Sequence, residues 1–119
     1  ALGKEGWVMG KKAPHHSVYV IELPIKVAED KKFKKMNPDY VLGNTCLYVG
    51  MTGLPVEKRF EQHATGHKKA SRVCRRYGVN RLRPNLYKRL NPMHWEAAEK
   101  AEVNHANHLR NSGYGLIQS

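Results

Sequence analysis

Apolar and polar positions along the chain predict short strands that alternate with helices. Residues 17–23 are largely β-branched or aromatic and end at Pro24, which is typical of a strand. Residues 45–49 form a second run of this kind, which we expect to pair with the first in antiparallel fashion.

Three segments have helical spacing and are bounded by glycine or proline, namely 55–64, 67–77 and 93–111. Pro55 suits the first helical position, where the N–H that proline lacks would have no partner in any case. The pair Asn91-Pro92 is expected to cap and start the long third helix.

The remaining stretches have weaker patterns. Residues 1–16 are rich in glycine and lysine and are expected to form a basic arm. Residues 24–44 contain several turn signals and predict a long basic connection with room for one helical turn. Residues 81–87 look extended, although Pro84 interrupts them, and residues 114–117 can add a short edge strand.

Length places these elements in one domain, since 119 residues match the usual size of a single compact unit. We predict a domain of the α/β (α+β) class over residues 17–119. Its core would be a small antiparallel sheet of about three strands, flanked by helices.

Charge is the strongest feature of the composition. The chain has 21 Lys and Arg against 10 Asp and Glu, a formal net charge of +11 with neutral histidines. Such an excess attracts polyanions through counterion release, and nucleic acid is the usual polyanion. A soluble basic protein with no such partner is the simpler alternative.

The two cysteines and the lack of long apolar runs indicate the cellular compartment in which we expect the protein. Cys46 lies in a strand pattern and Cys74 in a helical one, so we expect two buried thiols rather than a disulfide. No run approaches the roughly 20 apolar residues of a membrane span. We therefore expect a cytoplasmic protein with no membrane partner.

Glu102 lies in the middle of an apolar stripe on the predicted long helix. At 100° per residue, its neighbours on that face are Trp95, Ala98, Ala106 and Leu109. Burying a carboxylate is costly unless it is paired, coordinated or protonated. A buried salt bridge to an arginine, or a stripe that faces solvent, would be the ordinary explanation.

Tyr48 closes the second predicted strand, and Arg59 and His63 lie one turn apart on the helix that follows. An arginine can bind phosphate through two hydrogen bonds and can stabilise charge that develops on phosphorus. Tyr19 has a similar place in the first strand. Taken singly, the tyrosines match core aromatics, and Arg59 and His63 match a solvated basic face.

Five positions resemble, in order and spacing, the successive motifs of the GIY-YIG nuclease superfamily: Tyr19, Tyr48 in Tyr48-Val49-Gly50, Arg59, His63 and Glu102. The resemblance spans roughly residues 17–115. It implies that Glu102 holds one divalent metal, magnesium or another such as manganese, and that Arg59 binds the scissile phosphate. It also implies that the two tyrosines line the pocket, with Tyr19 or Tyr48 as the base that activates water. His63 would orient or protonate a reacting oxygen.

Three features depart from the family pattern. Ser17 replaces the glycine of the first motif, and Gly115 stands where many members have an asparagine. The link between the two tyrosines is longer than the usual hairpin, so residues 24–44 are expected to be an inserted basic loop.

The implied activity is metal-dependent hydrolysis of DNA phosphodiester bonds. Seven cations after the first helix are expected to follow the nucleic-acid backbone: Lys68, Lys69, Arg72, Arg75, Arg76, Arg81 and Arg83. DNA is favoured over RNA as substrate, and a homodimer or a separate targeting partner would supply specificity. The rival hypothesis is a non-catalytic DNA- or RNA-binding module that retains the fold.

Overall fold

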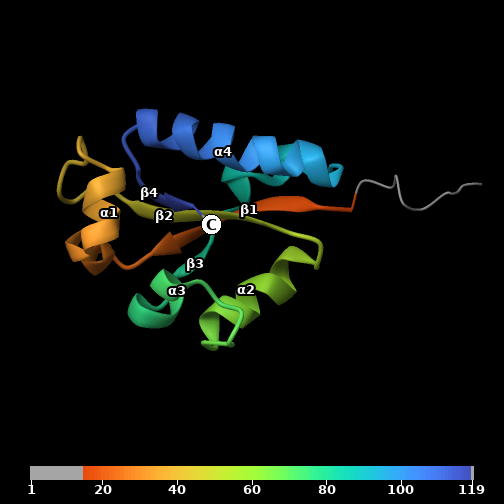
Figure 1. The fold of residues 1–119 in the computed structure, drawn as a ribbon, viewed down its shortest axis with the longest axis horizontal. Helices are drawn as coiled ribbons and strands as arrows, with labels where there is room; N and C mark the ends of the chain where they lie inside the picture. The colour runs from red at the N-terminus through yellow and green to blue at the C-terminus, as the bar shows by residue number, and fades with distance from the viewer. Residues whose placement is uncertain (1–14, 119) are drawn as a thin grey trace, which may run out of the picture.

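A four-stranded mixed sheet forms the centre of the molecule (Figure 1), in a computed structural model that describes residues 15–118. The strands are β1 (Ser17–Leu23), β2 (Cys46–Thr52), β3 (Arg81–Leu82) and β4 (Gly115–Gln118). Their order across the sheet is β3-β1-β2-β4; β1 is antiparallel to both of its neighbours, and β4 runs parallel to β2.

The α+β class is confirmed, but the sheet differs from the predicted antiparallel one of about three strands. The C-terminal tail adds a fourth strand, and that strand is parallel to its neighbour. A parallel pair needs a long crossover between its strands. The long helix before β4 carries the chain back along the sheet and so permits this direction.

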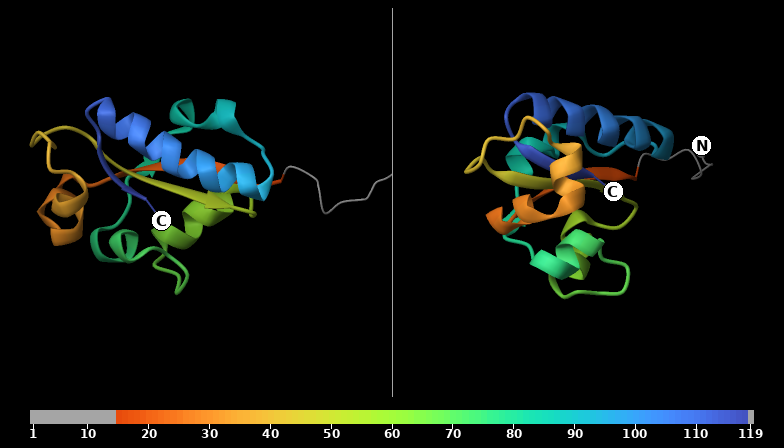
Figure 2. Two further views of the ribbon diagram at one scale, coloured as in Figure 1. Left: turned by 45° about the horizontal axis from the view of Figure 1, so that its top comes forward. Right: turned by 60° about the vertical axis from the view of Figure 1, so that its left-hand side comes forward.

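Four α-helices surround the sheet, with short 3₁₀ turns between them. They are α1 (Lys31–Met36), α2 (Val56–Ala64), α3 (Arg72–Tyr77) and α4 (Trp95–Asn111), and the 3₁₀ turns are η2 (Ile25–Glu29), η3 (Pro84–Leu86) and η4 (Lys88–Leu90). Figures 1 and 2 show α4 along one side of the strands and α2 and α3 on the other. Both faces of the sheet are therefore covered.

The strand register explains which side chains meet which helices. Tyr19 pairs with Gly50 and Ile21 with Tyr48, so both tyrosines lie on the same face of the sheet. Val20, which pairs with Val49, lies on the opposite face and is fully buried.

Two predicted helix starts are wrong, and capping explains the first of them. The second helix begins at Arg72 rather than at residue 67, since the Ser71 side chain accepts a hydrogen bond from the Cys74 N–H at 3.1 Å. The long helix begins at Trp95 after a cis Asn91-Pro92 bond. Asn91 does not cap it.

The side chain of Asn91 instead binds the sheet. Its Nδ2 donates to the carbonyl of Val18, and its Oδ1 accepts from the Val18 N–H at 2.8 Å. The predicted extended run 81–87 is also shorter than expected, because it pairs only over β3 and then turns at Pro84.

Residues 24–44 pack as part of the domain, although they were predicted to be a basic loop. Phe33 of α1 is fully buried. The Asn37 side chain acts as a strand partner for β4, since Oδ1 accepts from the Leu116 N–H and Nδ2 donates to the Leu116 carbonyl, both at 2.9 Å. The segment thus covers the outer edge of the sheet, where unpaired backbone groups would otherwise lie.

Other expectations fall within the described part of the chain. Cys46 and Cys74 are both buried and free, which confirms the prediction of two thiols. Across residues 15–118, no helix combines the length and the apolar character that crossing a membrane requires. Residues 1–14 of the predicted arm lie outside the described residues.

Candidate active site

Two strands and a helix bring Tyr19, Tyr48 and His63 into one buried group, here called the tyrosine cluster. The Tyr19 hydroxyl lies 2.8 Å from Nε2 of His63, across a sequence separation of 44 residues. The Tyr48 ring meets the His63 ring edge-on with centroids 5.2 Å apart, and the two tyrosine rings are 6.2 Å apart. None of the three residues is more than 2% exposed.

Gly50 makes room for this cluster. A Cβ at that position would stand 2.6 Å from the Tyr19 hydroxyl oxygen and 3.1 Å from Cε2 of Tyr48. The first distance is shorter than real Cβ contacts allow, so Tyr19 would have to move. The glycine that follows Tyr48-Val49 therefore lets the phenol of the neighbouring strand lie against the backbone.

The hydrogen-bond network assigns the tautomer of His63. The backbone N–H of Ser71 points at Nδ1 of His63 at 3.2 Å, and a backbone N–H can only donate. Nδ1 is therefore the acceptor, and the neutral ring carries its hydrogen on Nε2. His63 consequently donates to the Tyr19 oxygen, which leaves the Tyr19 proton available for another acceptor.

Burial keeps both members of this pair neutral. Desolvation lowers the pKa of His63 to about 4, and the nearby positive charge of Arg59 adds to this. Desolvation also raises the pKa of Tyr19 well above its ordinary value, and Tyr48 adds to the rise. Arg59 acts in the opposite direction on Tyr19, since its charge favours the phenolate.

Arg59 is the member of the site that reaches solvent. It lies on α2 one turn before His63, is partly exposed, and donates from Nη1 to Oε1 of Gln62 at 2.7 Å. Its guanidinium keeps further donors for an anion that approaches from outside. Arg59 thus links the buried tyrosine cluster to the surface.

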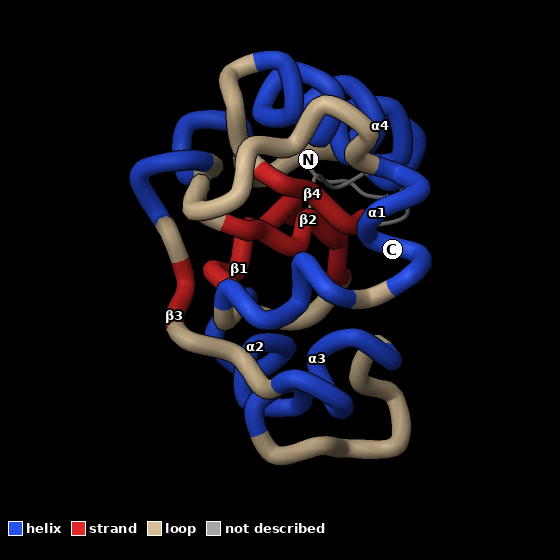
Figure 3. Tube along the Cα trace, turned by 90° about the vertical axis from the view of Figure 1, so that its left-hand side faces the viewer, coloured by secondary structure: helices blue, strands red, loops and turns tan. Residues whose placement is uncertain are grey.

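Glu102 is buried in the stripe predicted for the long helix. Its exposed fraction is 7%, and Ala98, Ala106 and Leu109 are buried beside it on α4. Trp95, which was expected on the same stripe, is 49% exposed because it begins the helix. α4 approaches the strands from the side opposite to α2 and α3 (Figure 3).

Glu102 offers a carboxylate, which is the kind of ligand that Mg²⁺ prefers. Within residues 15–118, no group of three or more His, Cys, Asp or Glu side chains is arranged to hold a metal ion. A structural zinc site needs four such ligands, whereas Mg²⁺ is commonly held by one or two carboxylates and several waters. A single buried carboxylate therefore suits Mg²⁺ or Mn²⁺.

The seven predicted nucleic-acid-binding cations lie around α3 and β3, and all but one of them are exposed. The exposed ones are Lys68, Lys69, Arg72, Arg75, Arg76 and Arg81, and Arg83 is partly buried. α3 follows α2 directly and contacts it, so these cations begin next to the tyrosine cluster.

Three of these arginines have carboxylate partners. Arg81 and Arg83 both contact Oε1 of Glu22, at 3.2 and 3.0 Å. Arg72 forms an ion pair with Asp30 at 3.1 Å, although half of its side chain remains exposed. Their charge is partly neutralised within the protein, which leaves the lysines and the other arginines as the stronger sites for phosphate.

Two residues that support the site were not predicted from the sequence. Ser71 was not connected to His63, because its N–H reaches the imidazole only after the chain turns between α2 and α3. Asp30 accepts from Arg72 and from the Tyr77 hydroxyl at 3.0 Å, and we call these three residues the Asp30 cluster. An aspartate one residue before α1 is a recognisable cap, but its distant partners leave no sequence signal.

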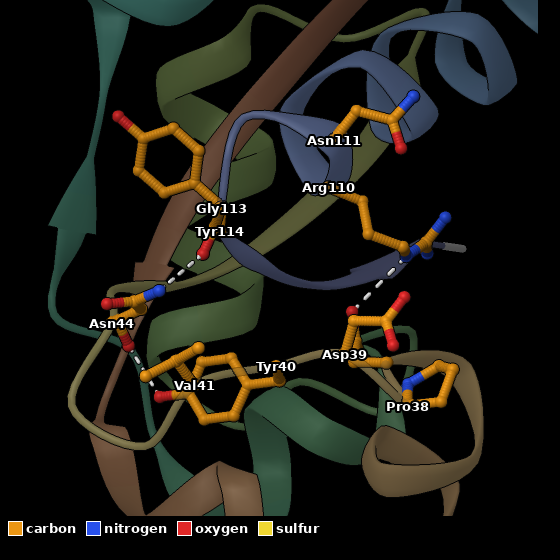
Figure 4. Close-up of a pocket in the computed structure, with 10 residues that line it drawn as sticks. Pro38, Asp39, Tyr40, Val41, Asn44, Arg110, Asn111, Gly113 and Tyr114 are labelled. Atoms are coloured by element: carbon orange, nitrogen blue, oxygen red, sulfur yellow. Dashed lines mark hydrogen bonds between the residues drawn. The ribbon is translucent and has the colours of Figure 1, made fainter.

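A pocket of about 390 Å³ lies at another part of the molecule. It is formed by residues 37–44 and the C-terminal end of α4, and Figure 4 shows Asn44 and Tyr40 tied together at its rim. Asn44 Nδ2 also donates to the Gly113 carbonyl at 3.0 Å. None of the five predicted catalytic residues lines this pocket.

No protein-family model, no curated protein and no solved structure matches the chain significantly.

Proposed function

We propose that this protein is a metal-dependent endonuclease that hydrolyses DNA phosphodiester bonds by a GIY-YIG-type mechanism. The observation that carries the proposal is the hydrogen bond between Tyr19 and His63, with Tyr48 against the same imidazole. These residues were expected to meet because of their resemblance to the motifs of one family.

Within this proposal Tyr19, rather than Tyr48, is the tyrosine that acts on water. His63 donates to the Tyr19 oxygen, and a hydrogen bond to that oxygen favours its charged form. Burial nevertheless keeps the phenol protonated in the protein alone, so a second cation must approach before Tyr19 can accept a proton. Until then Tyr19 stays protonated.

Arg59 would bind the scissile phosphate, because it is the partly exposed cation beside the cluster. Two parallel N–H donors match the geometry of a phosphate, and the charge stabilises the pentavalent transition state. His63 would hold Tyr19 in place as a neutral donor, since its lowered pKa keeps it from acting as a general acid near neutral pH.

Glu102 would hold Mg²⁺ or Mn²⁺, with water completing the coordination. When bound, such an ion would supply a positive charge and lower the pKa of a coordinated water. Glu102 lies on the buried stripe of α4 together with Ala98, Ala106 and Leu109.

The proposal is tested by incubating supercoiled plasmid with Mg²⁺ and three proteins: wild type, Glu102→Ala and Arg59→Ala. We expect nicking by wild type, a loss of at least about 100-fold in both variants, and no nicking in EDTA. Equal nicking by all three proteins would reject the catalytic assignment.

One observation favours a second function. The tyrosine cluster is at most 2% exposed, which suits a non-catalytic nucleic-acid-binding module in which the cluster supports the fold. That module would bind DNA or RNA in a salt-dependent way without cleaving either, and binding of equal-length DNA and RNA in competition would show which it prefers.

A further inference from the structure

The Asp30 cluster joins two basic helices that are far apart in the sequence. Asp30 caps α1 by accepting from the backbone N–H groups of Lys32 and Phe33. The same carboxylate accepts two hydrogen bonds from Arg72 of α3 at 3.1 and 3.2 Å. These side-chain hydrogen bonds link the start of α1 to the start of α3.

The cations of α1 all face outward. Phe33 is fully buried, whereas Lys31, Lys32, Lys34 and Lys35 are exposed. The negative charge of Asp30 does not neutralise these lysines, because Asp30 forms an ion pair with Arg72. α1 therefore adds four exposed cations near the exposed arginines of α3.

This arrangement of lysines does not serve the stability of the helix. Lys31 stands three and four residues before Lys34 and Lys35, and like charges at these spacings repel. Lys31 and Lys32 also occupy the first turn, where the positive end of the helix dipole disfavours cations. A polyanion bound across α1 would relieve both costs.

We propose that α1 extends the nucleic-acid surface, so that its lysines bind the phosphodiester backbone beyond the cations of α3. The inference rests on the proposed function, since it takes nucleic acid as the partner. Contacts lead step by step from the candidate active site to this surface. His63 accepts from Ser71, the next residue is Arg72, and Arg72 binds Asp30 at the start of α1. DNA held at the tyrosine cluster would thus continue over α3 and reach α1.

The test compares two triple variants of equal charge in binding to a short DNA duplex. One carries Lys31→Gln, Lys34→Gln and Lys35→Gln, and the control carries Lys88→Gln, Arg89→Gln and Lys100→Gln, which are exposed cations on η4 and α4. The dissociation constant is measured over a range of salt concentrations. We expect the α1 variant to reduce the slope of log K against log [salt] by about two to three, and the control by less than one.

Chemical acetylation of lysines gives a second readout that does not depend on cleavage. Mass spectrometry should show that duplex DNA protects Lys31, Lys34 and Lys35 and leaves Lys88 and Lys100 reactive. Stronger protection of the α1 lysines by polyglutamate than by DNA would overturn the inference and point to an acidic protein partner.

The failures of the two proposals can be told apart. If wild type binds and cleaves DNA but the α1 variant matches the control in slope and protection, this inference is wrong and the proposed function stands. If wild type fails to bind duplex DNA even at low salt, both are overturned.

Discussion

The Asp30 cluster and the tyrosine cluster each connect distant parts of this small domain, and they favour opposite charge states. The Asp30 cluster contains a carboxylate that accepts from Arg72, from Tyr77 and from two backbone N–H groups. Arg72 holds the pKa of Asp30 far below its ordinary value, and Asp30 raises that of Arg72. Asp30 and Arg72 are therefore stable in their charged forms, whereas Tyr77 stays neutral because burial and its hydrogen bond to Asp30 raise its pKa.

The tyrosine cluster stabilises neutral forms instead. Burial raises the pKa of Tyr19 and lowers that of His63 to about 4, and the positive charge of Arg59 opposes the rise at Tyr19. Both clusters join positions more than 40 residues apart, since the sequence separations are 42 for Asp30–Arg72 and 44 for Tyr19–His63. The ion pair between Asp30 and Arg72 stabilises the fold. The neutral pair of Tyr19 and His63 lies beside Arg59, and its protonation can change when another charged group binds nearby.

The largest effect should be the pH dependence that His63 gives to stability. The pKa of His63 is about 4 in the folded protein and 6.5 in a free chain, so the unfolded state binds the proton first as pH falls. Stability should therefore be lost between pH 6.5 and pH 4, by about 3 kcal/mol.

Urea unfolding across that pH range measures this loss. In His63→Gln the loss should largely disappear, whereas the exposed control His67→Gln should keep it. An unchanged pH dependence in His63→Gln would show that the neutral histidine of the tyrosine cluster does not control acid stability.

Removing the central carboxylate should have the next largest effect. Asp30→Ala deletes the cap of α1 and leaves Arg72 without its partner, so we expect a loss of about 2 kcal/mol in the free energy of unfolding. Asp30→Asn keeps an oxygen for the backbone N–H groups and should lose about half as much. Equal losses in both variants would mean that only the ion pair matters.

The smallest of these changes in stability should come from Gly50→Ala. The added Cβ must displace Tyr19, which we expect to cost about 1 to 2 kcal/mol and to weaken the bond to His63. Gly53→Ala is the control, because its Cβ would lie 3.2 Å from a flexible histidine side chain. Chemical denaturation and the tyrosine fluorescence of both variants measure the difference, and equal behaviour would contradict the close approach of Tyr19 to the backbone.

Sequence patterns predicted the structural features that depend on local residue types and helical spacing. They failed where contacts between distant residues determine the structure. Strand 17–23 follows from its β-branched and aromatic residues, and the burial of Glu102 follows from the helical stripe; both are observed. Segment 24–44 looked like a loop because its lysines obscure the few buried apolar residues, among them Val27 and Phe33, and because Asn37 binds a strand 79 residues away. The parallel direction of β4 likewise depends on where α4 lies, which no local pattern records.

The candidate site shows the same division. Tyr19, Tyr48 and His63 were predicted through a family resemblance, whereas their contacts with Gly50 and Ser71 depend on strand register and on the turn after α2. Residue spacing along the sequence predicts neither the strand register nor the path of this turn.

The comparison of the two clusters can be tested by one substitution made in each. Tyr19→Phe and Tyr77→Phe both delete a single phenolic hydroxyl, one bonded to His63 and the other to Asp30. Plasmid cleavage in Mg²⁺ and thermal unfolding are measured for both variants beside wild type. We predict that Tyr19→Phe loses at least about 100-fold in cleavage rate while Tyr77→Phe keeps the wild-type rate and only lowers the Tm slightly. Cleavage by Tyr19→Phe at the wild-type rate would contradict the claim that the tyrosine cluster is an active centre.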